Sequence, residues 1–296
     1  MLLVALLAGC ATEQYRLEEL TPATQAAADD VPEQQKLQAR AALARYGAAV
    51  GAAGKQPRFV PVGEQTAQIG DGEAANGAFK RSLLAGKVVA TRKLPAAPRR
   101  TGEVVWDGGA TLSLPLISAE QALHEVVTAH PQECADCVPL RVVAARLTTA
   151  AVLTTRGEAT VPAWEFTLKG TAVRITHPAV AAGLKVTPPS WDPYDAPGGL
   201  AIDGARTTVG SRELTVSFTG SVGPASEPCG ADYTGRAVES EFAVVVIVVA
   251  RPHAAGEACR AIGAPRTATV TLDQPLGERA VLEVMQGLPV PVRITA

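Results

Sequence analysis

The run LRVVAARLTTAAVLTTRGEATVPAWEFTLKGTAVRITHPAVA, residues 140–181, carries the clearest fold signal in the chain. It contains three segments rich in valine, threonine and aromatic residues, which are residue types enriched in β-strands. Turn residues separate the segments, with Arg156 and Gly157 at the first break and Gly170 at the second. Such segments joined by short turns predict an antiparallel three-stranded meander.

A helix is expected immediately before this meander. In SAEQALHEVVTAH, residues 118–130, Ser118 stands three residues before Gln121, which is the spacing of a helix capping box. Apolar residues recur behind it at helical intervals. The order of helix and meander, together with the AWEF run at residues 163–166, resembles the small PepSY-type and cystatin-like modules of bacterial envelope proteins.

The sequence before residue 118 predicts further elements of the same module. A helix is expected to begin near Val31 and to end near Val50, and a shorter helix is expected over residues 73–86. Strands are expected over residues 87–94 and 102–117, the second with a hairpin turn at its Asp-Gly-Gly. The apolar positions of the first helix near helical spacing are Leu37, Ala41, Leu43, Ala44 and Ala48. We therefore assign residues 31–184 to an α+β module.

The remaining sequence predicts a second module made of strands. Residues 185–204 are rich in proline and glycine, which is typical of a linker. Short β-rich segments follow over residues 205–296 and predict a sandwich-like domain. Within it FAVVVIVVA, residues 242–250, is too short to span a bilayer, so we expect a central strand buried on both faces. The predicted fold class is α+β, an N-terminal helix-plus-antiparallel-sheet module followed by a C-terminal all-β sandwich-like module.

The first residues, MLLVALLAGC, predict export and a lipid anchor. Residues 1–9 are uncharged and apolar or small, as in the hydrophobic region of a secretory signal peptide. The tetrapeptide LAGC resembles the lipobox of bacterial lipoproteins, which implies cleavage before Cys10 and a covalent diacylglyceryl lipid on it. Polar sequence over residues 10–30 is typical of a disordered tether. We expect a protein anchored in membrane lipid on the extracytoplasmic face of the cell membrane, without another cofactor.

The cysteines fit this location. The chain has five, and lipid on Cys10 leaves Cys134, Cys137, Cys229 and Cys259, an even set that allows three pairings. Disulfides form in exported proteins. We favour Cys134 with Cys137 and Cys229 with Cys259, because each pair lies inside one predicted module.

A metal site and a redox site are the alternative interpretations of the first cysteine pair. His124 and His130 precede Cys134 and Cys137, and all four residue types can bind zinc. Their spacing matches no familiar zinc motif, so a disulfide loop beside surface histidines is the favoured interpretation. Thiol–disulfide catalysis is disfavoured because the pair follows a helix, whereas reactive cysteines often lie at helix N-termini.

Charge and motifs exclude or disfavour other functions. Lys and Arg total 27 against 29 acidic residues, without the basic stripe that nucleic-acid binding needs. We find no G-x-S-x-G motif, and no catalytic residue is assigned. The aromatic residues that could contact a ligand are Trp164, Trp191 and Tyr194.

The segments PRFVPVG, QIGDGE, TRGEATVPAWEF and PLGERAVLEVMQGLPVPV resemble uncharacterised actinobacterial lipoproteins. The resemblance implies an architecture and a location, and no activity comes with it. We therefore expect a binding or structural protein of the cell envelope, whose ligand is another envelope protein, a cell-wall polymer or a small molecule. The alternative is an exported enzyme, either a thiol–disulfide oxidoreductase using the CxxC pair or a hydrolase with a dispersed site.

Overall fold

The computed structural model describes residues 31–54, 58–70, 77–129, 134–181, 183–184, 186–190 and 197–295. The predicted signal peptide and tether, with Cys10, lie outside these residues, as do His130, Trp191 and Tyr194. Val31–Ala296 forms one compact unit, and the domain boundary expected at residues 185–204 stays a prediction. Among the described residues, no helix has the length and apolar character needed to cross a membrane.

The first sheet is organised around its long central strand β6 (Gly157–Leu168). β5 (Leu140–Thr154) pairs with β6 along one edge, while β3 (Thr101–Trp106) and β7 (Arg174–Pro178) share the other edge. Outward from these lie β4 (Thr111–Pro115) beside β3, β1 (Ala67–Ile69) beside β7 and β2 (Val88–Ala90) beside β5. The antiparallel order β5–β6–β7 confirms the predicted meander.

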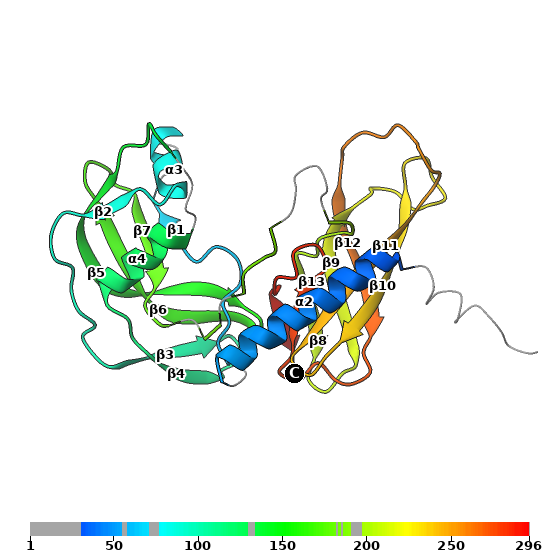
Figure 1. Ribbon diagram of the computed structural model, residues 1–296, viewed down its shortest axis with the longest axis horizontal. Coiled ribbons are helices and arrows are strands. Elements are labelled where there is room, and N and C mark those ends of the chain that lie inside the picture. The colour runs from blue at the N-terminus through cyan, green and yellow to red at the C-terminus, as the bar shows by residue number, and fades with distance from the viewer. Residues whose placement is uncertain are drawn as a thin grey trace, which may run out of the picture. The chain divides into compact units, whose positions relative to one another are not determined.

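Two helices cover one face of this sheet (Figure 1), namely α3 (Gly77–Leu84) and α4 (Ala119–Ala129). Ala122, Leu123 and Val126 of α4 pack in one core with Trp164 and Phe166 of β6. The predicted cap of α4 is present, because the hydroxyl of Ser118 accepts the N–H of Gln121 at 3.1 Å. The helix-before-meander prediction is therefore confirmed.

The end of α3 depends on a glycine. Gly86 has a φ of +61°, a conformation that side-chain-bearing residues rarely adopt. A Cβ atom there would lie 2.3 Å from the carbonyl oxygen of Val127, in α4. The absent side chain thus allows the end of α3 to approach the backbone of α4.

A second core lies on the opposite face of β6, towards its N-terminal end. Val161 packs there with Val104 and Trp106 of β3 and with Phe59, whose ring meets the Trp106 ring edge-on at 6.4 Å between centroids. The predicted Asp-Gly-Gly turn joins β3 to β4, and Gly109 adopts a φ of +81° in it. This core fixes the end of the sheet where the β3–β4 turn and the tip of the β5–β6 hairpin lie.

Beyond residue 203 the chain forms two further sheets. One has the order β10–β11–β13 and the other the order β12–β9–β8–β14. Their bounds are β8 (Gly204–Thr208), β9 (Glu213–Gly220), β10 (Ala231–Glu239), β11 (Ala243–Pro252), β12 (Ala264–Thr271), β13 (Ala280–Glu283) and β14 (Val292–Thr295). Apolar side chains of β9, β11 and β12 form a core shared by the two sheets, as predicted for a sandwich. The pairs β11–β13 and β8–β14 are parallel.

Strand β11 is buried on both faces, as predicted for residues 242–250. Val244 and Val246 point into the sandwich core, while Val245 and Ile247 lie in a separate core on the other side of the sheet. That second core is closed by α2 (Glu33–Ala52), which runs across this sheet (Figure 1). A helix and a sheet therefore enclose the sheet that contains β11.

The position of α2 differs from the expectation. We assigned this helix to the α+β module, whereas its buried face packs on β11 and β13. Its predicted apolar positions are also wrong in part, since Leu37 is 57 % exposed and Ala41, Ala44 and Ala48 are exposed too. The buried residues are Ala39, Ala42, Tyr46 and Val50. Alanine occurs on every side of α2, so apolar spacing alone does not distinguish its buried face.

Candidate functional site

The aromatic candidate that the structure describes is a core residue. Trp164 is 2 % exposed, and its indole N–H donates to the carbonyl oxygen of Ile117 at 3.0 Å. A ligand cannot reach a side chain packed in this way, so the expectation of a ligand contact at Trp164 is not supported by its position. Trp191 and Tyr194 lie outside the described residues.

The cysteine pair Cys134–Cys137 forms a disulfide, as favoured from the sequence. Metal binding needs a deprotonated thiolate, which a disulfide does not provide. His124 is exposed on α4, and His130 lies outside the described residues. This arrangement supports the disulfide-loop interpretation over a zinc site.

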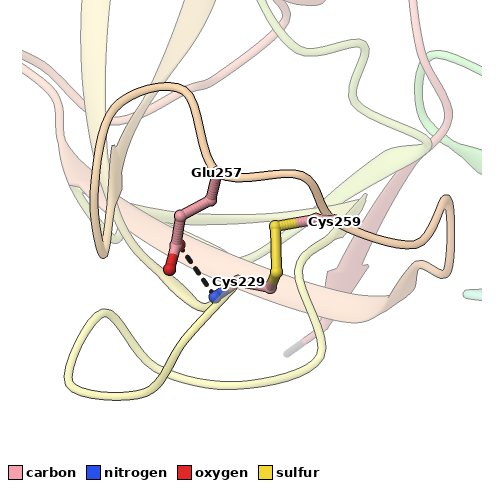
Figure 2. Close-up of side chains that lie close together, drawn as sticks. All are labelled: Cys229, Glu257 and Cys259. Atoms are coloured by element: carbon pink, nitrogen blue, oxygen red, sulfur yellow. Dashed lines mark hydrogen bonds between the residues drawn. A yellow bond between two sulfur atoms is a disulfide. The ribbon is translucent and has the colours of Figure 1, made fainter.

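The second pair, Cys229–Cys259, is also a disulfide, with its Cα atoms 5.6 Å apart. It joins the loop after β9 to the loop after β11. Glu257 lies beside it, and its carboxylate accepts the backbone N–H of Cys229 at 3.0 Å (Figure 2). The three side chains have the residue types of a metal site, but both sulfur atoms are consumed by their mutual bond. We interpret this group as a loop staple.

A hydroxyl, an imidazole and a carboxylate that the sequence did not predict are linked in series at the edge of the first sheet. Nδ1 of His177 is 3.2 Å from the hydroxyl oxygen of Thr66, and its Nε2 is 3.2 Å from a carboxylate oxygen of Glu125. Because an ionised carboxylate only accepts, the neutral tautomer of His177 that fits donates from Nε2 to Glu125 and accepts a hydrogen bond from the Thr66 hydroxyl at Nδ1.

This chain of groups joins the segment before β1, strand β7 and helix α4. A cavity of about 200 Å³ lies beside His177 and Gln65, and Thr66 is not among its lining residues. The His177 side chain is only 7 % exposed. The hydroxyl is therefore not presented to a ligand in this cavity, and we interpret the chain as a tie between sheet and helix.

A buried carboxylate on β6 is also neutralised by its neighbours. Glu165 accepts two hydrogen bonds from the guanidinium of Arg146, at 2.8 and 3.1 Å, and lies 3.4 Å from Arg174. The hydrogen bonding to Arg146 holds the pKa of Glu165 below its usual range, against the opposing effect of burial. The group is fully paired, which favours a structural role.

A cleft with polar walls lies between the tip of the β5–β6 hairpin and the outer face of the sheet β12–β9–β8–β14. Its volume is about 340 Å³, which is within the range of small-molecule sites. We call it the hairpin cleft. Its polar lining residues include Arg156, Glu158, Arg206, Thr215, Ser217 and Arg293.

The sheet wall of the hairpin cleft is built by strand alternation. In β9 and β12 the residues that point into the sandwich are apolar, and the intervening residues Thr215, Ser217 and Thr267 point outward. Arg206 of β8 and Arg293 of β14 are direct neighbours in the parallel register. Both side chains are exposed, on the same outward face.

The hairpin wall carries its own charges. Arg156 at the hairpin tip forms an ion pair with Glu278 at 3.1 Å and lies 5.9 Å from the centroid of the Trp106 ring. The Trp106 indole N–H donates to the hydroxyl of Thr154 at 3.0 Å, which holds the ring in place. The charge of Arg156 is therefore balanced by Glu278. Among the described residues, no carboxylate forms an ion pair with Arg206 or Arg293 on the opposite wall.

No family model, curated protein or solved structure that we compared matches this chain.

The pairing of Arg206 with Arg293 was not predicted from the sequence. The local signal is present, because GARTT and VRIT each alternate an outward arginine and threonine with inward residues. The missing information is the pairing of β8 with β14, which joins residues more than eighty positions apart.

Proposed function

We propose that this protein is a lipid-anchored, extracytoplasmic lipoprotein of the bacterial cell envelope that binds a cell-wall polymer in the hairpin cleft. The anchor is the diacylglyceryl lipid expected on Cys10, and the proposal extends the resemblance to actinobacterial lipoproteins. The observation that carries the binding function is the cleft of about 340 Å³ with hydroxyl and guanidinium groups on one wall.

The chemistry of the cleft favours a polymer with many hydroxyl groups over a protein partner. Stable protein partners bury about 800 Å² on each side and centre on an apolar patch. The hairpin cleft instead presents the hydroxyl groups of Thr215 and Ser217 on β9 and of Thr267, which lies beside Ser217 on β12. Hydroxyl groups that donate and accept suit the hydroxyl groups of a sugar chain.

Filling the cleft tests the binding function. We expect the full chain carrying Cys10→Ser, which removes the lipid, to sediment with insoluble bacterial cell wall. Adding Ser217→Trp places an indole in the cleft and is expected to weaken this binding at least about tenfold, a loss of roughly 1.4 kcal/mol. Bound and free protein are measured in the pellet and supernatant over a range of cell-wall concentrations.

Thr271→Trp is the matched control, since Thr271 lies on the same outward face of the sheet and outside the cleft lining. It is expected to bind as the parent does. Failure of the parent protein to sediment with cell wall, or equal loss with both tryptophan variants, would contradict the proposal.

The anchor is tested by metabolic labelling. Cells that express the natural chain are expected to incorporate a fatty-acid probe into the protein, and cells that express Cys10→Ser are not, because the thioether link needs the Cys10 sulfur. Labelled protein is detected after denaturing electrophoresis. Equal labelling of the two proteins would show that Cys10 is not the attachment site.

A further inference from the structure

We infer that the hairpin cleft binds an acidic sugar unit, whose carboxylate or phosphate is held jointly by the guanidinium groups of Arg206 and Arg293. The inference rests on the proposed function, because it names the chemical class of the polymer bound at the same site. Its first support is the register of two strands that are distant in sequence, β8 and β14.

Arg206 and Arg293 form a like-charge pair at directly adjacent sheet positions. Like charges in this arrangement destabilise a sheet unless another group compensates them. Among the residues that the structure describes, neither guanidinium has a hydrogen bond or an ion pair. Arg146 and Arg174 also lie near each other in a sheet, but these two arginines share the carboxylate of Glu165. Among the described residues, Arg206 and Arg293 therefore have no carboxylate as a counter-ion, and an anionic ligand can take that place.

The two guanidinium groups suit an oxyanion. Each presents planar, parallel N–H donors that match the oxygens of a carboxylate or phosphate, and charge-assisted hydrogen bonds of this kind are the strong ones. Thr215 is the next residue across the sheet from Arg206, so a hydroxyl group lies beside the charged pair. An acidic sugar can use both, with its acid group on the arginines and its hydroxyl groups on the side chains of Thr215, Ser217 and Thr267.

The opposite wall gives the ligand an orientation. Asp107 and Glu158 line that side of the cleft, and among the described residues neither forms an ion pair. Their carboxylates repel an acid group and accept hydrogen bonds from sugar hydroxyl groups. The cleft is thus positive on the sheet wall and negative on the hairpin wall, which favours one acid group per bound unit, directed at the sheet.

The experiment compares three sugars that share one ring. Side-chain Nε–Hε signals of the full-length Cys10→Ser protein are recorded by nuclear magnetic resonance and assigned with R206Q and R293Q. Glucuronate or glucose 6-phosphate is expected to shift both arginine signals in a saturable way, and whichever acts at lower concentration identifies carboxylate or phosphate as the preferred acid. Glucose is expected to leave them in place. No response to either acidic sugar, or an equal response to glucose, overturns the inference.

A double variant separates this inference from the proposed function. R206Q/R293Q is expected to weaken binding of the acidic sugar and of cell wall at least about tenfold relative to R99Q/R260Q, which removes the same charge from exposed positions outside the cleft. Undiminished cell-wall binding by R206Q/R293Q would overturn the acidic-sugar inference and leave the binding function standing. Saturable arginine shifts in a protein that does not sediment with cell wall would instead refute the polymer as ligand.

Discussion

Replacing Tyr46 with alanine is expected to lower the free energy of unfolding by about 3–5 kcal/mol, the usual cost of removing a large buried aromatic side chain. Tyr46 is 1 % exposed and lies in the core between α2 and the strands β11 and β13. The substitution leaves a cavity there and removes the largest side chain of the buried face of α2. Urea unfolding followed by circular dichroism measures the change.

Leu37→Ala is the control on the same helix. Leu37 is 57 % exposed, so its truncation is expected to change the free energy of unfolding by less than about 0.5 kcal/mol. A larger effect at Leu37 than at Tyr46 would mean that α2 packs through the other face, as the sequence pattern first indicated.

The phenol of Tyr46 also predicts a specific loss of stability in alkali. Burial raises the pKa of Tyr46 from 10.0 to about 12, because the charged phenolate is poorly solvated in the core. Above pH 10 the unfolded chain loses this proton more readily than the folded chain, so the stabilisation present below pH 10 declines as the pH rises towards 12. The expected loss is about 2 kcal/mol.

Tyr46→Phe removes this titration and keeps the ring. The stability difference between the natural chain and Tyr46→Phe is expected to be constant below pH 9 and to shift in favour of phenylalanine above pH 10. Other titrating groups are common to both proteins and cancel in the comparison. A pH-independent difference would contradict the burial of the hydroxyl.

Removing the second disulfide has the other large expected effect. Cys229 and Cys259 are separated by 30 positions. Closing a loop of this length lowers the conformational entropy of the unfolded chain, which stabilises the folded state by about 3.5 kcal/mol. We expect Cys229→Ser/Cys259→Ser to lower the free energy of unfolding by that amount. The midpoint of urea unfolding should move accordingly, without a change in the native sandwich core, because both cysteines are exposed.

Cys134→Ser/Cys137→Ser is the matched control. Its loop spans only 3 positions, for which the same relation gives about 2 kcal/mol. If the two double variants lose the same free energy of unfolding, chain entropy does not dominate the effect of these disulfides. A larger loss for the short loop would mean that the Cys134–Cys137 bond stabilises the folded state through contacts of its own.

The elements predicted well are those specified by neighbouring residues. The Ser118 cap, the Asp-Gly-Gly turn and the strands β5 to β7 depend on contacts within short stretches, so local pattern was sufficient. Strand β11 was predicted because only burial on both faces explains its uninterrupted apolar run. The tight turn between β10 and β11, in which the Ser240 N–H donates to the carbonyl oxygen of Ala243, was not predicted.

The predictions that failed or were missed depend on distant partners. The buried face of α2 is decided by strands some two hundred residues later, and Ala39 and Ala42 look no more apolar than the exposed Ala41 and Ala44. In the same way Arg206 and Arg293 become a site only when β14 aligns beside β8, and β8 begins inside the predicted linker. The line from Thr66 to Glu125 likewise joins three segments that sequence spacing does not relate.

The packing of α2 on β11 and β13 has a consequence for biogenesis. The helix is synthesised long before the strands that cover it, and the entire first sheet is made in the interval. During that time the nascent chain carries an unshielded helix, and exposed apolar surface at this stage promotes aggregation. Two of the four buried residues of α2 are alanines, so the helix exposes little apolar surface before β11 and β13 are synthesised. The strands β11 and β13 cover the helix once they are made, and the whole first sheet lies between helix and strands in the sequence.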